Sequence, residues 1–328
     1  MLIAADIGGT KTVLGIFTRD KGPCTPIFDK TYTSNSFSSF EDIVAEFITA
    51  AGVKPDKGIF AVSGPVLGVE ARPTNLPWSV GIRKLRNRFN ISSVRLINDI
   101  AAMAYAVPAL DNDDFHSLNE GVETADGMRA VIAPGTGLGE AFFHKVRGRI
   151  KVYASEGGHA DFPPTDELTW SLTQHLEEKY HHVSCEQVCS GKGIVNIYKF
   201  LRDAGYCEEP EWLKSELSHA RDKSTVIIQT CNDLTRQNEL TSTTLELFMS
   251  LLGAEAGNMA LKVMATGGIY LGGGIPRRIV PALAAGPFMK AFAAKGRFSD
   301  MMSRIPVRII LNEKAALIGT ARIGLGLS

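Results

Sequence analysis

The feature that most constrains this chain is a pattern that occurs twice: an apolar run, a glycine-rich turn and a second apolar run. The first copy spans residues 2–17 with Gly8-Gly9-Thr10 at the turn, and the second spans 130–143 with Pro134-Gly135-Thr136-Gly137. Short apolar runs joined by glycine turns predict buried strands paired as hairpins. The copies lie about 127 residues apart, far more than the period of a solenoid. The repeat therefore predicts two related domains and not an array.

The rest of the chain alternates between strand and helix patterns. Short apolar runs predict strands at 59–63, 95–97, 267–271 and 307–311. Apolar residues at helical spacing predict helices at 40–51, 100–107 and 313–323, and a mostly helical region at 166–264 with its longest helix at 243–264. The polar, acidic stretch 108–127 is interpreted as a connection between two halves. This alternation indicates an α/β fold, and 328 residues suffice for about two domains.

Charge and cysteine content narrow the class of protein. The chain has 35 Lys and Arg and 35 Asp and Glu residues, so it lacks the net positive field on which a mainly electrostatic nucleic-acid binder depends. No apolar run approaches the roughly 20 residues that span a bilayer, and an aspartate interrupts the N-terminal apolar stretch, unlike in a signal peptide. Five widely spaced cysteines fit free thiols in a reducing compartment. We therefore expect a cytoplasmic protein with neither a nucleic-acid nor a membrane partner.

The first glycine turn has the chemistry of a phosphate site. Two glycines allow backbone N–H groups to approach an anion closely, and Thr10 adds a hydroxyl donor. Asp6, at the end of the preceding strand, would repel a bare phosphate and makes sense beside a hydrated Mg²⁺. The alternative is a plain hairpin turn with a surface acid, and the buried strand and the aspartate weigh against it.

The second glycine turn, Gly135-Thr136-Gly137, would hold the same polyphosphate from the other side. Alone it is an ordinary turn, and it gains weight as a second copy of the first. It lacks the G-x-G-x-x-G spacing of a dinucleotide fingerprint, and a strand is expected after it instead of a helix. Ser190-Gly191-Lys192-Gly193 is not a nucleotide P-loop, because the earlier glycine is missing and a glycine follows Lys192 where Ser or Thr is needed.

Asn98 and Asp99 lie at a predicted strand-to-helix junction. Both residue types are preferred helix caps, so a purely structural role is one interpretation. The other is catalytic. An aspartate at the carboxyl end of a strand faces the crevice where α/β proteins bind ligands, and it can accept a hydroxyl proton as the catalytic aspartate of a kinase does.

Glu156 and His159 are separated by two glycines, which expose both side chains to a ligand. An acid and an imidazole suit hydrogen bonding to vicinal hydroxyls, so we favour sugar recognition. A purely structural pair of the two side chains is the second alternative, and a metal site with only two ligands is the third. Two histidines and two cysteines in the run from His181 to Cys189 look like a zinc box. Their spacing matches no usual zinc site and no second cluster accompanies them, so the cysteines are better interpreted as small core residues.

Together these segments resemble the bacterial glucokinase family, which are ATP-dependent hexose kinases of the actin-like ATPase and sugar kinase superfamily. The resemblance covers nearly the whole chain, and eight pieces appear in the family's order. They are Ala-Asp-Ile-Gly-Gly-Thr at 5–10, Thr-Asn-Leu-Pro-Trp at 74–78, Leu-Ile-Asn-Asp at 96–99, Pro-Gly-Thr-Gly-Leu-Gly at 134–139, Glu-Gly-Gly-His-Ala-Asp-Phe at 156–162, the segment 186–198, Gly-Gly-Ile-Tyr-Leu-Gly-Gly-Gly-Ile at 267–275 and Lys-Gly-Arg-Phe at 295–298. Departures from the family's common residues are Ser63, Cys185, Cys189 and Lys192.

The resemblance implies a role for each matching residue. Asp99 matches the catalytic base. The implied sugar-binding set is Asn98, Asp99, Glu156, His159, Glu186 and, within 74–78, Asn75. The implied nucleotide-binding set is Ala5, Asp6, Ile7, Gly8, Gly9 and Thr10 in the first phosphate motif, Gly135, Thr136 and Gly137 in the second, and Gly272, Gly273 and Gly274 beside adenosine. Asp6 would orient Mg²⁺ through water.

The resemblance also implies a two-domain actin-like ATPase (ribonuclease H-like) α/β fold with a ligand cleft between the domains. Residues 1–109 would form a small domain on which 312–328 pack back, and 110–311 would form a large one. The implied reaction transfers the γ-phosphoryl group of Mg-ATP to the 6-hydroxyl of glucose, and the family often forms homodimers. The alternatives are a kinase for another hexose or an amino sugar, a kinase that uses polyphosphate or ADP, and a sugar-sensing protein without turnover.

Overall fold

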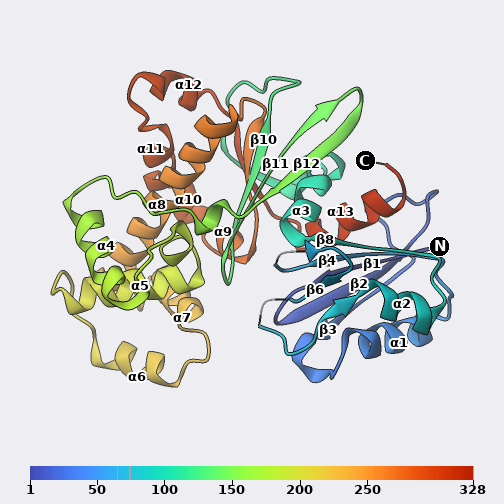
Figure 1. Ribbon diagram of the computed structural model, residues 1–328. Coiled ribbons are helices and arrows are strands. Elements are labelled where there is room, and N and C mark those ends of the chain that lie inside the picture. The colour runs from blue at the N-terminus through green and yellow to red at the C-terminus, as the bar shows by residue number, and fades with distance from the viewer. Residues whose placement is uncertain (65, 74, 328) are drawn as a thin grey trace. The chain divides into compact units, whose positions relative to one another are not determined.

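The computed structural model describes residues 1–64, 66–73 and 75–327, which form an α/β protein (Figure 1). The chain divides into two compact units. One contains residues 1–114, 141–154 and 312–328, and the other contains 115–140 and 155–311. The first unit thus includes residues 141–154, which follow the second glycine turn. The domain ranges that the resemblance implies, 1–109 with 312–328 and 110–311, stay a prediction.

A five-stranded sheet with the order β3-β2-β1-β4-β8 forms the centre of the first unit. Its strands are β1 (Leu2–Ile7), β2 (Lys11–Phe17), β3 (Phe28–Thr33), β4 (Lys57–Val62) and β8 (Ser93–Asn98). β2 pairs antiparallel with β1 and β3, whereas β4 pairs parallel with β1 and β8. The predicted hairpin around the first glycine turn and the strands predicted near 59–63 and 95–97 are confirmed.

β1 is buried on both faces, which explains its continuous apolar run. Ile3, Ala5 and Ile7 belong to the core that includes α1 (Phe40–Ala51) and α2 (Ile82–Phe89). The alternate residues Leu2 and Ala4 belong to the core that includes α3 (Asp99–Ala106) and α13 (Ala315–Gly324). Figure 1 shows these two pairs of helices on opposite sides of the sheet.

The predicted helix at 40–51 is confirmed as α1 with the same bounds. The Ser39 hydroxyl accepts a hydrogen bond from the Asp42 N–H at 3.2 Å, which caps the start of the helix. Gly52 ends it in a left-handed conformation with φ 65°, which a residue without Cβ adopts at little cost. The first unit also contains three two-residue strands, β5 (Val66–Leu67), β6 (Glu70–Ala71) and β7 (Val80–Gly81).

A six-stranded sheet has the order β12-β11-β10-β13-β14-β9. Its strands are β9 (Phe115–Asn119), β10 (Arg129–Pro134), β11 (Leu138–Val146), β12 (Arg149–Ser155), β13 (Gly268–Leu271) and β14 (Val307–Ile310). The four inner strands are those that apolar runs predict. The interpretation of all of 108–127 as a connection is wrong, because β9 lies within it and pairs antiparallel with β14. β9 and β12 are edge strands without a fully buried side chain, so neither has a continuous apolar run.

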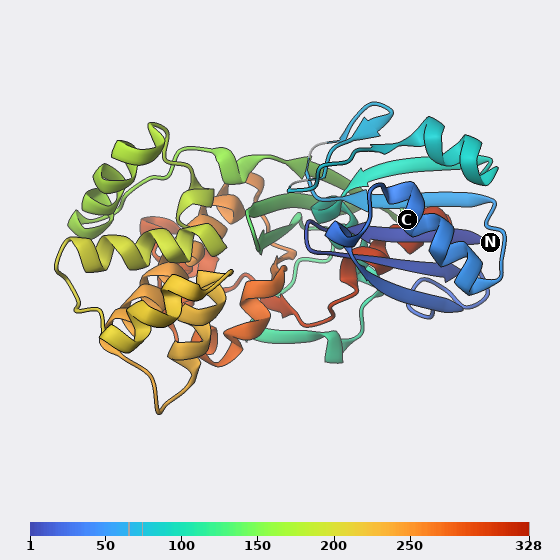
Figure 2. The ribbon, with the colours of Figure 1, turned by 90° about the horizontal axis from the view of Figure 1, so that it is seen from below.

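Helices make up most of the second unit. They are α4 (Glu167–Tyr180), α5 (Gly191–Asp203), α6 (Glu211–His219), α7 (Lys223–Asn232), α8 (Glu239–Val263), α9 (Gly274–Arg278), α10 (Val280–Ala284), α11 (Pro287–Ala293) and α12 (Ser299–Ser303). In Figure 2 the green-yellow to orange segments, α4 to α8, form one group. α8 is the longest helix, as predicted, and it begins earlier than residue 243 because the Asn238 side chain caps it at Glu239. None of the helices in the described part of the chain combines the length and hydropathy that a membrane span requires.

The packing of α13 on α3 depends on a glycine. A Cβ atom placed on Gly319 would lie 1.7 Å from the carbonyl oxygen of Ala102. Because backbone atoms on both sides of this contact cannot yield easily, we expect Gly319→Ala to lower the free energy of unfolding by about 1–3 kcal/mol. Gly81→Ala is the control, since its nearest neighbour would be the Lys84 side chain at 3.7 Å. Urea denaturation measures both, and equal stability of the two variants would contradict this account of the packing.

Candidate active site

The first glycine turn is held by hydrogen bonds to one serine. Gly8 N–H donates to the Lys11 carbonyl at 3.0 Å and closes the turn between β1 and β2. Ser34 then fixes the turn from outside, because its hydroxyl donates to the Gly8 carbonyl at 2.7 Å and its N–H donates to the Thr10 carbonyl at 3.0 Å. Ser34 is fully buried and also bonds the hydroxyl of Thr12 at 2.9 Å. Nothing in the sequence pattern indicates Ser34, which is one of several serines in a polar run.

Asp6 lies near the carboxyl end of β1, before this turn. Burial raises the pKa of its carboxyl group to about 6, although the positive charge of Lys11 acts in the opposite direction. Ala5 and Ile7, on either side of Asp6, have fully buried side chains and are paired with Leu14 and Thr12 of β2. This pairing fixes the positions of Asp6 and Gly8. Gly9 and Thr10 complete the turn, and Thr10 is exposed.

The residues around Asp6 fit a magnesium ion that is bound mainly by phosphate and water. Among the described residues, no group of three or more His, Cys, Asp or Glu side chains is placed to hold a metal ion. Mg²⁺ keeps several waters and commonly uses one or two carboxylates together with substrate phosphates. A single carboxylate beside a turn predicted to bind phosphate is consistent with that mode, in which Asp6 would act through water.

Asn98 and Asp99 lie at the same edge of the sheet as Asp6. β1, β4 and β8 are parallel neighbours, with Asp6 paired to Ala61 and Ala61 paired to Ile97, so their carboxyl ends coincide. The capping interpretation of Asn98 is confirmed: its Oδ1 accepts from the N–H groups of Ile100 and Ala101 at 2.9 and 3.0 Å. Capping does not occupy the whole side chain. Among the residues that the structure describes, Asn98 Nδ2 donates one hydrogen bond, to the Gly64 carbonyl at 3.2 Å.

The carboxylate of Asp99 is oriented at the first turn of α3. Its Oδ1 accepts from the N–H of Ile100 at 2.9 Å. Asn75 lies between β6 and β7, exposed and with a left-handed backbone (φ 64°). Within the described ranges no hydrogen bond joins Asn75 to Asn98 or Asp99, and its neighbour in the family motif, Thr74, lies outside the described residues.

In the second unit, three of the predicted segments, 156–162, 186–198 and 267–275, converge on the second glycine turn. Glu186 Oε2 accepts from the Leu138 N–H at 3.0 Å, and a Cβ on Gly137 would lie 2.3 Å from the same oxygen. The Gly135 carbonyl accepts from the Gly191 N–H at 2.8 Å. A glycine at 137 is therefore required for the carboxylate to approach. Thr136 at the tip of this turn is exposed.

The glycines at 272–274 lie beside the strand that leads into the same turn. The Gly272 N–H donates to the Ile132 carbonyl at 2.9 Å. Gly273 has φ 80°, and a Cβ there would lie 2.5 Å from the Pro134 carbonyl oxygen. Gly274 begins α9, with open space around its Cβ position. The structure thus brings the predicted adenosine-side glycines and the second phosphate motif together.

Glu156 precedes a short 3₁₀ helix, Gly157–His159, and His159 ends it. The His159 N–H donates to the Glu156 carbonyl at 3.0 Å. Both side chains are exposed. The turn packs on the second glycine segment, because a Cβ on Gly158 would lie 2.3 Å from the Leu138 carbonyl oxygen. Leu138 therefore bonds Glu186 and contacts this turn, so Glu156, His159 and Glu186 belong to one cluster.

Glu140 lies directly behind this cluster and was not expected from the sequence pattern. Its side chain is only 5% exposed, and its Oε2 would lie 2.0 Å from a Cβ on Gly157. Burial, together with the negative charge of Glu255, raises the pKa of Glu140 to about 7. Within the described part of the chain its Oε1 has no hydrogen-bond partner. One acid next to the apolar run 141–143 is the sequence signal that could have indicated it.

Cys185, the residue before Glu186, lies in the same buried region as Glu140 and Glu255. Its thiol lies 3.4 Å from Glu255 Oε2, which also accepts from Asn258 Nδ2 at 3.1 Å. Lys295 donates to Asn258 Oδ1 at 2.7 Å. Cys185 and Cys189 are both core residues, and burial raises the pKa of each thiol. The network fixes the backbone at 185, next to Glu186.

The fold of this chain is similar to that of solved glucokinase structures. The actin-like α/β architecture is seen in the glucokinase from an Antarctic psychrotroph, which is 30% identical, with a TM-score of 0.83 and coverage of 100% of this chain and 99% of that one. A ROK family glucokinase from Streptomyces griseus, in complex with glucose and AMPPNP, is 20% identical with a TM-score of 0.65 over 98% of both chains, and this shows the fold alone. The predicted α/β, actin-like fold class is confirmed.

Sequence comparison gives the family. The sequence model described as Glucokinase matches residues 3–325. The glucokinase of Nostoc punctiforme is 37% identical over 333 residues, covering 98% of each chain. The glucokinase of Synechocystis sp. is 37% identical over 342 residues, covering 97% of this chain and 96% of that one. The chain belongs to the glucokinase family, as the motifs indicated.

The buried acid Glu140 predicts a pH-dependent stability. Because its pKa is raised from 4.5 to about 7 in the folded state, the folded protein binds the proton more tightly than the unfolded chain. The stabilisation is complete below about pH 4.5 and is lost as the pH rises toward 7. Glu140→Gln removes the charge and keeps the shape. We expect the variant to be more stable than the wild type at pH 8, by about 1–3 kcal/mol, and equal to it near pH 4.5.

Urea denaturation at the two pH values measures this difference. The exposed Glu120→Gln is the control and should not change with pH in this way. A stability difference for Glu140→Gln that is the same at both pH values would show that the folded-state pKa of Glu140 is not raised.

Proposed function

We propose that this protein is a glucokinase that transfers the γ-phosphoryl group of Mg-ATP to the 6-hydroxyl of glucose, giving glucose 6-phosphate and ADP. The observation that carries the proposal is the convergence on the second glycine turn: Glu186 and Gly191 bond it directly, and Gly273 and the Glu156–His159 turn pack against it. Hydroxyl-binding side chains and a phosphate-binding backbone are thus combined in one cluster. The full-length similarity to proteins named glucokinase supports the substrate.

In the proposed site, the two glycine turns bind the phosphates of one nucleotide through backbone N–H groups. Gly274, with open space around its Cβ position, would leave room for adenosine beside the second turn. Bound Mg²⁺ would neutralise charge on the phosphate oxygens, and Asp6 is the residue that would hold its water shell. The protein's share of catalysis is mainly to position the reactants and stabilise charge.

The sugar is bound in this proposal by Asn98, Glu156, His159 and Glu186, with Asn75 as a further contact. Because Asn98 Oδ1 already accepts two N–H groups of α3, Asn98 would use its remaining Nδ2 hydrogen to donate to a sugar oxygen. The carboxylates of Glu156 and Glu186 would accept hydrogen bonds from sugar hydroxyls. A site with several such partners rejects sugars that lack a hydroxyl, since a buried acceptor would be left unpaired.

Asp99 is the proposed general base. It would accept the proton of the 6-hydroxyl as this oxygen attacks the γ-phosphorus. Its place at the start of α3, with Oδ1 oriented by the Ile100 N–H, gives the carboxylate a defined direction. The proposal requires Asp99 and Asn98 of the first unit to act on the same sugar as Glu156, His159 and Glu186 of the second. A cytoplasmic location and a homodimer remain parts of the proposal.

A coupled assay of ADP release tests the function with glucose, mannose, fructose, N-acetylglucosamine and N-acetylmannosamine. Glucose-dependent release, with kcat/KM for the other sugars lower by about tenfold or more, would support a glucokinase. Activity on another sugar would keep the fold and the mechanism but overturn the substrate. Glucose binding by calorimetry without turnover would favour the sugar-sensing alternative, or a different phosphoryl donor, which polyphosphate and ADP would reveal.

Asp99→Asn removes the proposed base without removing the side-chain volume. We expect kcat to fall by at least about 10²-fold, the usual contribution of general-base catalysis, with glucose affinity kept within about tenfold. Steady-state kinetics and calorimetry measure the two effects. Asp113→Asn, an exposed aspartate, is the control. Near-normal turnover by Asp99→Asn would exclude this residue as the base.

Ser34→Ala removes the hydroxyl that holds the Gly8 carbonyl. The first phosphate turn would lose its fixed geometry, so KM for ATP should rise by about three- to tenfold, the equivalent of one hydrogen bond. KM for glucose should change little. Ser36→Ala is a matched control, since Ser36 is exposed in the same short 3₁₀ helix. An unchanged KM for ATP in Ser34→Ala would mean that the turn does not depend on Ser34.

A further inference from the structure

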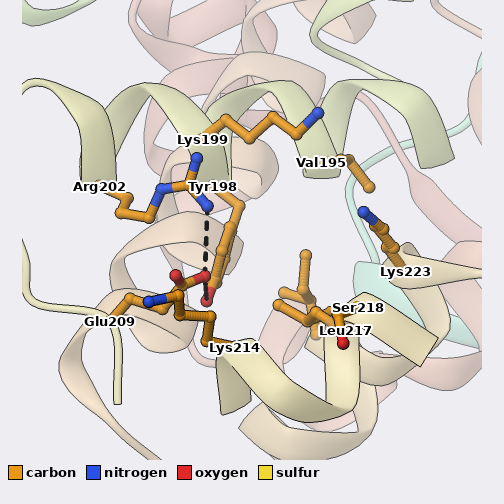
Figure 3. A pocket seen from close by; sticks show the side chains of 10 residues that line it. Val195, Tyr198, Lys199, Arg202, Glu209, Lys214, Leu217, Ser218 and Lys223 are labelled. Atoms are coloured by element: carbon orange, nitrogen blue, oxygen red, sulfur yellow. Dashed lines mark hydrogen bonds and ion pairs between the residues drawn. The ribbon is translucent and has the colours of Figure 1, made fainter. Parts of the chain in front are cut away.

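A cavity of about 180 Å³ lies among α5, α6 and α7, in the second unit (Figure 3). Its wall is apolar and is formed by Val195, Leu217, Ile227 and the ring of Tyr198. Val195 and Tyr198 fall within the family segment 186–198, but none of these four residues belongs to the proposed nucleotide- or sugar-binding sets. The volume is smaller than the roughly 300–1,000 Å³ of drug-sized sites, so the cavity suits a compact metabolite.

Four cationic side chains also line the cavity, with one carboxylate. The carboxylate, Glu209, is already satisfied, because it accepts from the Tyr198 hydroxyl at 2.9 Å and from Arg202 Nη1 at 3.3 Å. Figure 3 shows Arg202 and Lys223 on opposite sides of the cavity. The remaining cations are Lys199 and Lys214. The cavity therefore has an excess of positive charge.

The three lysines of the cavity form few ion pairs with the described residues. The Lys214 ammonium lies 3.3 Å from the Glu211 carboxylate, an exposed ion pair of a kind that contributes little. Within the described ranges, neither Lys199 nor Lys223 has an ion-pair partner. Lys223 is the first residue of α7, where a cation is unfavourable for the helix dipole and a bound anion is favourable.

The cavity is connected to the second glycine turn by two helices. α5 lines the cavity and begins at Gly191, whose N–H donates to the Gly135 carbonyl at 2.8 Å. Ser224, the residue after Lys223, contacts the same glycine, because a Cβ on Gly191 would lie 3.2 Å from its hydroxyl. A ligand that draws Lys223 toward α5 would thus act on groups that hold the phosphate-binding turn.

We propose that this basic cavity binds a small phosphate monoester and that its occupancy changes the affinity of the second glycine turn for ATP. An apolar wall with an excess of cations fits a short carbon chain that carries a dianionic phosphate. Any coupling is reciprocal, so ATP would change the affinity for the phosphate ester by the same factor. The coupling rests on the proposed function, whereas the binding does not.

Calorimetry with glycerol 3-phosphate, 3-phosphoglycerate and inorganic phosphate tests the binding, using protein saturated with glucose and Mg-AMPPNP so that the active site is blocked. We expect saturable binding of an ester to the wild type and affinity lower by about tenfold or more in Lys199→Ala and Lys223→Ala. Lys290→Ala, an exposed lysine on α11, removes the same charge elsewhere and should bind normally. No saturable binding, or equal loss in Lys290→Ala, would overturn the site.

Kinetics then test the coupling. The ester should change KM for ATP by about fivefold or more in the wild type and in Lys290→Ala, and not in Lys223→Ala. Binding without any change of KM would overturn the coupling. If the protein had no kinase activity, the calorimetric comparison of the lysine variants would still decide whether the cavity binds the ester, so the two proposals fail separately.

Discussion

The second unit depends on one hydrogen bond between a carboxylate and a backbone amide, from Leu138 N–H to Glu186 Oε2 at 3.0 Å. It is possible only because residue 137 is a glycine, since a Cβ there would occupy the position of the carboxylate. The bond joins a turn suited to phosphate to a residue suited to sugar hydroxyls. Gly158 and Gly273 pack around this bond at places where a Cβ would collide with backbone, and a Cβ on Gly191 would lie in tight contact, 3.2 Å from the Ser224 hydroxyl.

The two glycine turns are similar in sequence but are held in different ways. In the first unit a buried serine, Ser34, binds the turn from the side. In the second unit, the side chain of Glu186 and the backbone of Gly191 do so. Both units also bury an acid beside the turn, Asp6 in one and Glu140 in the other, and burial raises the pKa of each. Burying a carboxyl group costs stability, which is typical of sites that are kept for function.

Sequence pattern predicts those parts of the fold that are buried on both faces. β1 and β10 are continuous apolar runs because both of their faces are buried. The helical spacing of apolar residues predicts α1 with the bounds that the structure has. The edge strands β9 and β12 were missed because half-buried strands have mixed composition. At the candidate site, sequence motifs predict residues such as Asp99 and Glu186, and their roles stay predictions. No motif indicates Ser34 or Glu140, because each acts through contacts with residues far away in the sequence.

Hydrogen exchange with and without Mg-AMPPNP, in the presence of glucose, tests most directly whether both turns bind one nucleotide. Amides in direct contact with a ligand exchange more slowly when it binds. We predict slower exchange at both Gly9–Thr10 and Thr136–Gly137, at the same nucleotide concentration, since the N–H groups of Gly8 and Gly135 already bond carbonyl groups within the turns. Protection of only one of these turns, with saturating nucleotide, would contradict the account of two turns that hold the same phosphates.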